Sequence, residues 1–388
     1  MIRIDDSVIT AQMLQDKLGS ERVVEVCPRA KLTPSAIDFL RERDVETVRR
    51  EAGSSDRASV GSPAASASGQ RRDFKGIFCP NIVIFDRNGK VNYGEMERYV
   101  NWLIDAGIHG LYPNGSTGEF VRLSWEERQD VVRLIAEVNN GRVPILAGAS
   151  EANTRDVLKM AEFYASIDVD AISLVPPYYY KISDESLFEY FAEIAEQSPL
   201  DILLYNIPQF TQELPLELME RLLPYERIFG TKDSSRDLPR LINTMHRLRA
   251  QRPDYVVLVG CEEILFPSVM MGASGGTIAT SGIVPEVIVE LYDQALANNV
   301  DRARILQYRI LDLINLMLLG VNFPEGFKTG VAVRGFDVGP ARTSASDGEQ
   351  EYLLKLESQI GCILSDMGYA VRGARACPIT NLPPIVGR

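Results

Sequence analysis

The sequence predicts an α/β protein whose main part is a (β/α)₈ barrel, or TIM barrel, followed by a helical extension and preceded by a small αβ module. Three observations lead to this prediction. Short apolar, β-rich runs recur through residues 74–300 with a period of roughly 30 residues. A segment with helical spacing of its apolar residues follows each run. No glycine-rich nucleotide fingerprint follows the first run, which disfavours the alternative of an open, doubly wound sheet.

Residues 1–50 alternate helical and extended patterns. "ITAQMLQDKL" and "LTPSAIDFLRER" have helical periodicity, whereas "RVVEV" and "VETV" are short β-rich runs. We therefore expect a small αβ appendage. Residues 51–73 are rich in Ala, Ser and Gly. Because such a segment buries too little apolar surface to offset its ordering entropy, we expect a flexible linker.

The barrel is expected over residues 74–300. Near-continuous apolar runs are typical of parallel strands that are covered on both faces. The eight runs are "IFCPNIVIF", "GIHGLYPNG", "VPILAG", "DAISLVPP", "DILLYN", "RIFGTK", "YVVLVG" and "GGTIAT". Amphipathic helical patterns separate them, among them "SWEERQDVVRLIAEVN", "DESLFEYFAEIAEQ" and "PEVIVELYDQALAN".

The chain after the barrel contains three further helical patterns. They lie within "DRARILQYRILDLINLMLL", "VNFPEGFKTGVAVRG" and "GEQEYLLKLESQIGCILSDMG". We therefore expect a C-terminal helical extension over residues 301–370. Residues 371–388 include the proline-rich "ACPITNLPPIVGR", which is typical of an extended tail.

Composition argues against several classes of function. The formal net charge is −12 and no basic run occurs, so we expect no nucleic-acid partner. The chain has only two histidines, His109 and His246, which makes a histidine-based metal centre or catalytic triad improbable. The five cysteines are widely spaced, as in reduced intracellular proteins. With no apolar run of about 18 residues, the sequence predicts a cytoplasmic protein without membrane contact.

The catalytic residues of such barrels follow the C-terminal ends of the strands. At these positions stand "GSTGE" (115–119), "PPYYY" (176–180), Tyr205, Lys232 and "GCEE" (260–263). Tyr205 and Lys232 end consecutive runs and can face one substrate. A lysine amine attacks a keto carbon to form an imine, which then accepts electrons as a proton is lost or a C–C bond breaks. Tyr205 could carry the protons.

Other residues at these ends have two interpretations each. Gly115, Ser116 and Thr117 can bind a substrate carboxylate through N–H and hydroxyl groups, or they can only form and cap a turn. The three tyrosines at 178–180 can act in the site or serve as packing aromatics. Glu262 and Glu263 can bind substrate hydroxyls, or they can be solvated acids at the start of a helix.

Residues 74 to about 335 resemble the dihydrodipicolinate synthase and N-acetylneuraminate lyase family of class I aldolases. The resemblance rests on "GSTGE", "YNIP" at 205–208 and "KDSS" at 232–235, in the family's order and spacing, and on "GCEEILFPSVMMGASGGTI". It implies that Lys232 forms the Schiff base, that Tyr205 relays protons and that Ser116 with Thr117 binds the pyruvate-like carboxylate.

The resemblance implies further properties of the site. Tyr179 matches a second catalytic tyrosine, which in some members reaches into a neighbouring subunit's site. Gly115, Ser234 and Ile278 join the candidate substrate-binding positions. The family is typically a homotetramer built from dimers, and its reaction needs no cofactor beyond the lysine imine and no metal.

Departures from the family pattern narrow the substrate. Phe210 stands where the synthase branch has an arginine for a second carboxylate, and Ala279 replaces a serine of the lyase branch. The segment "PPYYYKISDESLFEYFAEIAEQ" is most similar to aldolases acting on 2-keto-3-deoxy sugar acids. We therefore expect reversible cleavage of such an acid to pyruvate and an aldehyde. The alternative is a dehydratase, a hydratase-aldolase or a synthase-like condensing enzyme that uses the same imine. Two further alternatives are a pyruvate-sensing protein and a metal-dependent aldolase.

The resemblance does not extend to residues 1–73. Within them, "AKLTPSAIDFLRERDVE" is similar to segments near the termini of some enzymes of bacterial microcompartments. This similarity implies that residues 1–50 target the protein to such a shell or to a partner. An oligomerisation arm or a dispensable extension is the alternative.

Overall fold

The structure, a computed structural model, divides into two units, Met1–Ala67 and Ser68–Arg388. It describes residues 72–318, 322–369 and 371 of the second unit. Of the first unit it describes residues 2–4, 8–9, 14, 17–19, 21–26, 31–32, 36, 39–41 and 43–49. The predicted linker as far as residue 71 and the predicted tail from residue 372 lie outside the described residues.

The first unit contains two small parallel sheets. Strands β1 (Ile2–Ile4), β3 (Val23–Val26) and β5 (Glu46–Arg49) form one, in the order β1-β3-β5, and β2 (Val8–Ile9) pairs with β4 (Lys31–Leu32) in the other. Helical residues occur in both crossovers of the larger sheet, as parallel pairing requires a long connection. The core is formed by Leu14, Leu18, Val24, Val26, Ala36 and Leu40. The expected small αβ module is confirmed.

The second unit is built on eight parallel strands. The strands are β6 (Gly76–Cys79), β7 (Gly110–Leu111), β8 (Leu146–Gly148), β9 (Ala171–Leu174), β10 (Asp201–Asn206), β11 (Ile228–Asp233), β12 (Val256–Val259) and β13 (Gly275–Thr277). The order in the sheet is β7-β6-β13-β12-β11-β10-β9-β8, and a single parallel bridge between Leu111 and Ile145 joins its two ends. The sheet therefore forms a nearly closed barrel, as the sequence predicts.

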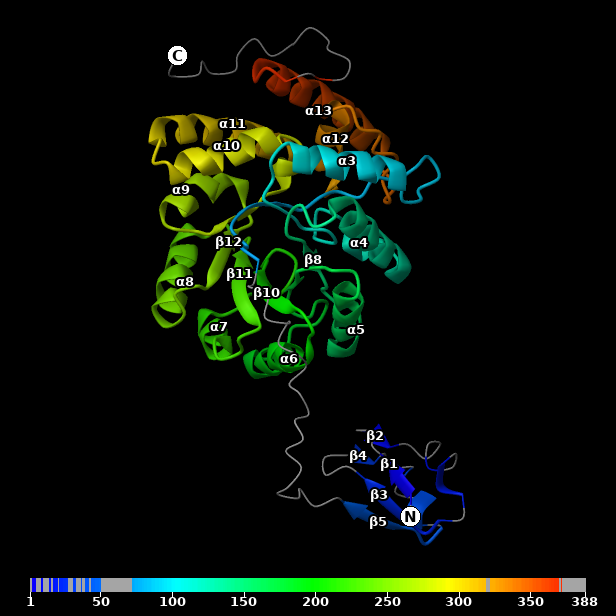
Figure 1. Ribbon diagram of the computed structural model, residues 1–388. Helices are drawn as coiled ribbons and strands as arrows, with labels where there is room; N and C mark the ends of the chain where they lie inside the picture. The colour runs from blue at the N-terminus through cyan, green and yellow to red at the C-terminus, as the bar shows by residue number, and fades with distance from the viewer. Residues whose placement is uncertain are drawn as a thin grey trace. The chain divides into compact units, whose positions relative to one another are not determined.

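Helices alternate with these strands and surround them (Figure 1). They are α3 (Tyr93–Asp105), α4 (Trp125–Asn139), α5 (Thr154–Ala165), α6 (Asp184–Gln197), α7 (Leu216–Leu222), α8 (Leu238–Gln251), α9 (Leu265–Met270) and α10 (Pro285–Leu296). Side-chain caps at Asn92, Ser124, Asn153, Ser183 and Asp237 satisfy free N–H groups where five of them begin. Three short 3₁₀ turns also lie near strand ends: η1 (Phe120–Arg122), η2 (Glu262–Ile264) and η3 (Ala279–Gly282).

Two apolar layers hold the barrel together. One lies inside it and consists of Phe74, Phe78, Tyr112, Leu146, Ala171, Leu203, Phe229, Val256 and Leu258. The neighbouring strand residues, such as Ile202 and Leu204 in β10, belong to the larger cluster that packs against the helices. Because successive side chains of a strand point to opposite faces, each apolar run contributes to both layers.

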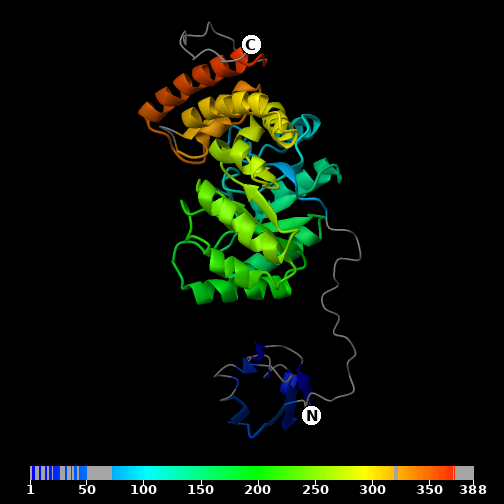
Figure 2. The same ribbon diagram turned by 90° about the vertical axis from the view of Figure 1, so that its left-hand side faces the viewer.

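Three more helices follow the barrel: α11 (Val300–Leu318), α12 (Glu325–Val333) and α13 (Asp347–Asp366). They pack on one another, α11 packs on α10, and all three gather on the side of the barrel where α3 and α10 lie (Figures 1 and 2). The expected C-terminal helical extension is confirmed. Within the residues that the structure describes, no helix is both long enough and apolar enough to cross a bilayer.

Candidate active site

The side chain of Lys232 lies at the C-terminal end of the barrel, on β11. Its register partner on β10 is Tyr205. Both side chains are buried, each only 4% exposed. The Nζ of Lys232 lies 4.0 Å from the centroid of the Tyr205 ring and 4.6 Å from that of Tyr112. Two aromatic faces thus shield the amine from water.

The residue that follows β12, Gly260, leaves room for this amine because it has no side chain. A Cβ at this position would lie 2.8 Å from the Cε of Lys232 and 2.0 Å from the Oγ of Ser234. The Ser234 hydroxyl lies 3.4 Å from the hydroxyl of Tyr205 and 3.4 Å from the carbonyl oxygen of Gly260. The ends of β10, β11 and β12 therefore meet around one small polar space.

A buried pair next to these residues fixes the two strand ends. Asn206 follows Tyr205, Asp233 follows Lys232, and the Asn206 amide donates to the Asp233 carboxylate at 2.8 Å. Asp233 also accepts from the backbone N–H of Ser235 at 2.8 Å and from Arg240 at 3.3 Å. This pair holds the phenol and the amine in their relative positions. Sequence analysis missed it, although the spacing to Tyr205 and Lys232 was a usable signal.

Tyr112 is a second residue of the site that sequence analysis missed. It follows β7, and its ring lies edge-on to that of Tyr205, with centroids 6.4 Å apart and an interplanar angle of 83°. Its hydroxyl donates to the Oγ of Ser173 at 2.7 Å. Burial raises the pKa of Tyr112 above its ordinary value, and nearby Tyr205 raises it further. Tyr112 therefore stays a neutral phenol that packs against the lysine.

The loop at residues 115–119, "GSTGE", begins directly beside this aromatic wall. A Cβ on Gly115 would lie 2.5 Å from the Tyr112 ring, so the close approach requires glycine. Thr117 is buried and Ser116 is half-buried. The loop ends at Glu119, whose φ of 48° places a non-glycine residue in the left-handed region. Ser116 and Thr117 thus belong to a constrained turn that begins beside the ring of Tyr112, whose centroid lies 4.6 Å from the Nζ of Lys232.

Glu119 ties this loop to the C-terminal extension. Its buried carboxylate pairs with the amine of Lys328 on α12, which is 2% exposed, and accepts from Arg122 at 3.2 Å. Lys328 also lies 3.7 Å from the carboxylate of Glu325. Burial raises the pKa of Glu325 above the ordinary value of a glutamate. Sequence analysis placed no functional residue on α12, because the contact joins segments far apart in the chain.

A cavity of about 430 Å³ adjoins the loop. The residues that line it include Ser116, Phe120, Tyr178, Phe210 and Phe323. The side chains of Val175, Ile207 and Tyr178, which line the cavity, pack on Tyr205. The ring of Tyr205 lies in turn 4.0 Å from the Nζ of Lys232. A volume of this size is within the range of about 300–1,000 Å³ that is usual for small-molecule sites.

The structure separates the tyrosines at 178–180. Tyr178 lines the cavity. Tyr179 is 90% exposed, has a φ of 82° and stacks edge-on against Tyr180 with centroids 4.8 Å apart. Tyr179 therefore does not approach Lys232 within one chain. Its positive φ is unusual for an aromatic residue, and such backbone strain is often found at functional positions.

The remaining predicted site residues have partners in the protein. The buried carboxylate of Glu262 accepts from the backbone N–H of Thr280 at 2.8 Å, and burial raises its pKa. Glu263 accepts from Arg236 at 2.9 Å. The side chain of Ile278 is fully buried. The second carboxylate oxygen of Glu263, Oε2, is buried and has no hydrogen-bond partner among the described residues.

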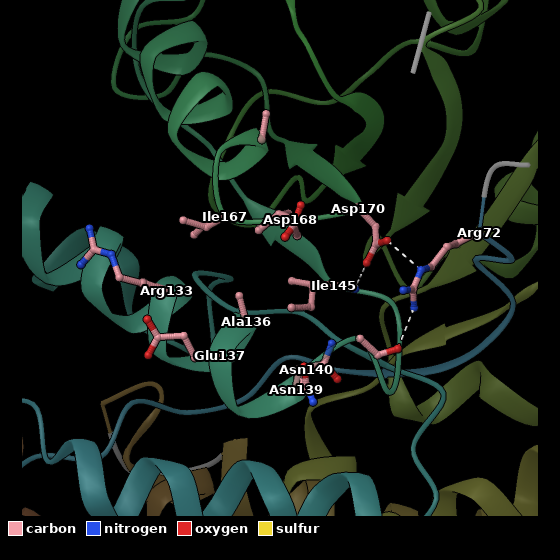
Figure 3. Close-up of a pocket in the computed structure, with 13 residues that line it drawn as sticks. Arg72, Arg133, Ala136, Glu137, Asn139, Asn140, Ile145, Ile167, Asp168 and Asp170 are labelled. Carbon is pink, nitrogen blue, oxygen red and sulfur yellow. Dashed lines mark hydrogen bonds and ion pairs between the residues drawn. The ribbon is translucent and has the colours of Figure 1, made fainter. Parts of the chain in front are cut away.

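A larger cavity, of about 810 Å³, is lined by the residues that Figure 3 draws as sticks. It adjoins the residues that precede β8 and β9, such as Ile145 and Asp170. Arg72 pairs there with Asp170 at 2.9 Å and donates to the carbonyl of Gly141 at 3.2 Å (Figure 3). In barrels of this kind the amino ends of the strands serve stability. The smaller cavity is therefore the candidate active site.

Residues 73–362 match the model of the dihydrodipicolinate synthetase family. The chain belongs to this family. A 4-hydroxy-tetrahydrodipicolinate synthase of Methanopyrus kandleri is 33% identical over 267 residues, which are 67% of this chain and 86% of the relative. An uncharacterized DapA-like lyase of Thermofilum pendens is 30% identical over 301 residues, which are 77% of this chain and 99% of the relative.

Solved structures give the same family assignment. YagE, a prophage protein of E. coli K12 in the dihydrodipicolinic acid synthase family, was solved in complex with pyruvate. It superposes with a TM-score of 0.71 and 28% identity, over 76% of this chain and 99% of YagE. Members of the dihydrodipicolinate synthetase family are lyases, so this chain is a family lyase, and the predicted fold and enzyme class are confirmed.

Proposed function

We propose that the protein is a class I aldolase that reversibly cleaves a 4-hydroxy-2-keto acid to pyruvate and an aldehyde through an imine on Lys232. The observation that carries this proposal is the buried amine 4.0 Å from the ring of Tyr205. An amine in such an apolar setting, beside a phenol, is suited to nucleophilic attack on a keto carbon. The pyruvate bound in YagE supports a keto acid ligand.

The proposed reaction has three steps: imine formation, cleavage of the C3–C4 bond, and hydrolysis. Nζ of Lys232 adds to C2 of the keto acid and water leaves, which forms a protonated imine. The C4 hydroxyl then loses its proton, the C3–C4 bond breaks, and its electron pair moves toward the imine to give an enamine and the aldehyde. Protonation of C3 and hydrolysis by water release pyruvate and the free amine. We assign these proton transfers to Tyr205, and the Ser234 hydroxyl, 3.4 Å from the Tyr205 hydroxyl, supports this role.

The loop at 115–119 is the proposed receptor for the substrate carboxylate. Ser116 lines the cavity and Thr117 is buried next to it. Hydroxyls and backbone N–H groups in a tight turn are suitable donors to a carboxylate. Gly115 lets this loop approach Tyr112 and thereby the amine.

The sequence resemblance favours a 2-keto-3-deoxy sugar acid as the substrate. Phe210 in place of an arginine is consistent with this, because a sugar aldehyde carries no second carboxylate near that position. Glu262 and Glu263, however, already have partners in Thr280 and Arg236. The sugar acid therefore stays a prediction that a substrate panel has to test.

Dehydration, hydration-aldol cleavage or condensation through the same imine is the second candidate. All share the lysine and differ in the bond broken after the imine forms. Release of pyruvate together with an aldehyde distinguishes aldol cleavage from loss of water, which leaves the carbon chain intact.

Tyr179 has a proposed role only in an assembly. Its 90% exposure in one chain is what a residue that reaches into a neighbouring subunit's site would have. We therefore propose a homo-oligomer, a tetramer by the family resemblance, in which Tyr179 contributes to proton relay. A role of residues 1–50 in binding a microcompartment shell or another partner stays a prediction.

Borohydride trapping tests the proposed chemistry. Incubation with pyruvate and borohydride should add a reduced pyruvate adduct to the peptide that contains Lys232, as detected by mass spectrometry. Lys232→Ala should abolish the adduct, whereas Lys355→Ala, at an exposed lysine of α13, should leave it unchanged. Persistence of the adduct in the Lys232→Ala protein would refute the proposal.

A further inference from the structure

The cavity beside the lysine is walled by two aromatic pairs. Phe120 and Tyr178 meet edge-on with ring centroids 6.3 Å apart at an interplanar angle of 79°. Phe210 and Phe323 lie 5.9 Å apart at 52°. These residues come from η1, from the segments after β9 and β10, and from the segment before α12. Four distant parts of the chain thus place aromatic rings around one space.

The polar side chains that line this cavity are largely engaged by the protein. The Thr211 hydroxyl lies 3.3 Å from the carbonyl oxygen of Ile207, and the amide of Asn322 donates to Glu349 at 2.8 Å. Arg122 donates to Glu119 at 3.2 Å and to the carbonyl of Phe323 at 2.9 Å. These groups would have to give up existing bonds to bind several substrate hydroxyls, which costs free energy.

Charge at the cavity is balanced. Two acids, Glu119 and Glu325, face two bases, Arg122 and Lys328, in one connected cluster. No surplus positive charge remains in that cluster to favour a second substrate carboxylate. The cluster equally has no surplus negative charge to favour an amine.

Large apolar side chains are exposed at the rim of the cavity. Phe210 is 58% exposed and Val121 is 67% exposed, and both line the cavity. Exposed apolar surface that is gathered around a hollow is typical of a ligand groove. Ile207 and Val175, which line the hollow, pack on Tyr205, whose ring lies 4.0 Å from the Nζ of Lys232.

We infer that the aldehyde partner in this site carries an apolar, planar tail, such as an aryl group, and not a chain of hydroxyls. This inference rests on the proposed lysine imine. In the condensing direction, C3 of the pyruvate enamine forms a bond to the aldehyde carbon, whose oxygen takes up a proton. The aryl group then lies between the Phe120–Tyr178 and Phe210–Phe323 pairs, where offset or edge-on ring contacts are favourable.

Competition between two aldehydes tests this inference. The full-length protein is given pyruvate with benzaldehyde or with glyceraldehyde, and the initial rate of aldol addition is measured at matched concentrations. We expect kcat/KM for benzaldehyde to exceed that for glyceraldehyde by about tenfold or more, a discrimination that apolar pockets commonly reach. Borohydride trapping of pyruvate is run in parallel to report on the imine alone.

Two matched variants locate the preference in the cavity. Phe210→Arg should lower the benzaldehyde-to-glyceraldehyde ratio about tenfold, because it removes one ring and adds a charge, while imine trapping continues. Tyr308→Arg, at a 61% exposed aromatic residue on α11, should leave the ratio unchanged. The oligomeric state of both variants is measured by light scattering.

The outcomes separate the inference from the proposed function. Imine trapping with equal or faster addition to glyceraldehyde, or without addition to benzaldehyde, overturns the inference and leaves the imine chemistry standing. A Phe210→Arg protein with an altered oligomeric state and an unaltered aldehyde ratio also overturns it, because Phe210 is then an interface residue. Failure to trap pyruvate at Lys232 overturns the proposed function and the inference together.

Discussion

Tyr205 and Lys232 are register partners on two neighbouring parallel strands, and the lysine nitrogen lies 4.0 Å from the centre of the tyrosine ring. The hydrogen bond between Asn206 and Asp233 repeats this pairing one residue further on. The relative position of the Tyr205 phenol and the Lys232 amine therefore follows from the strand register and from this buried hydrogen bond.

Removal of the Tyr205 hydroxyl should slow turnover and spare the imine. We expect Tyr205→Phe to lower kcat for keto acid cleavage by about 10²- to 10⁴-fold, because a positioned proton carrier is lost while the ring against Lys232 is kept. Trapping of pyruvate by borohydride should persist. Tyr308→Phe, at an exposed position, is the control. A Tyr205→Phe protein with the wild-type kcat would contradict the proposed role.

A methyl group at position 260 should displace the Lys232 side chain and so reduce imine formation, although the lysine itself is unchanged. The added Cβ of Gly260→Ala would lie 2.8 Å from the Cε of Lys232 and 2.0 Å from the Oγ of Ser234. We expect the trapped adduct to fall at least about tenfold, since misplacement of about 1 Å commonly costs more than that.

Gly361→Ala provides the matched control. Gly361 lies within α13, where an added Cβ meets nothing within 4 Å. The same substitution there should leave imine trapping unchanged and stabilise the helix by about 0.5–1 kcal/mol, as judged by thermal unfolding. Equal trapping in the two variants would show that Gly260 does not provide room for the lysine.

Loss of the buried amine on α12 should destabilise the barrel strongly. Lys328→Met leaves the Glu119 carboxylate buried with one counter-charge fewer. We expect the free energy of unfolding to fall by about 3–5 kcal/mol. Adding Glu119→Gln to Lys328→Met should recover part of this loss, because the uncompensated charge is removed. Urea unfolding followed by circular dichroism measures both, and an unchanged midpoint in Lys328→Met would refute the prediction.

Glu262 should make stability depend on pH in a defined direction. Burial raises the pKa of Glu262 in the folded state, so folding favours its protonated form. Stability from this group is therefore fully present below the unfolded pKa of about 4.3 and is lost as pH rises through the raised folded pKa. Glu262→Gln, which keeps an oxygen for the N–H of Thr280, should thus be more stable than wild type at pH 7.

Comparing the wild-type protein with the Glu262→Gln variant across pH separates the titration of Glu262 from that of other groups. The difference in unfolding free energy should shrink as pH falls through the raised pKa of Glu262 and vanish when its carboxyl is protonated in both states. A difference that grows on acidification would contradict the assigned direction.

Much of the fold could be predicted because its signals are local. Each buried parallel strand requires a short apolar run, and each covering helix requires one apolar face, so both appear as periodic patterns in the chain. The positions of Tyr205 and Lys232 at consecutive strand ends were readable for the same reason. The sequence could also show which residue types stand at those ends, including Ser116, Thr117 and Glu262.

Contacts between distant segments were not predictable in this way. The ring of Tyr112 over Lys232, the space left by Gly260 and the pairing of Glu119 with Lys328 depend on how the barrel closes and how α12 packs on it. The same packing engages Glu262 with Thr280 and turns Tyr179 outward. No spacing along the chain encodes these outcomes, because each depends on the distance between residues of different strands or helices.

The amino-acid sequence by itself determined the alternation of strands and helices and the position of a lysine at the end of one strand, since both follow from residue type and local periodicity. Only the tertiary structure decided which side chains surround the amine and the adjoining cavity. Side chains from distant segments become neighbours only when the sheet curves into a barrel and the C-terminal helices pack against it.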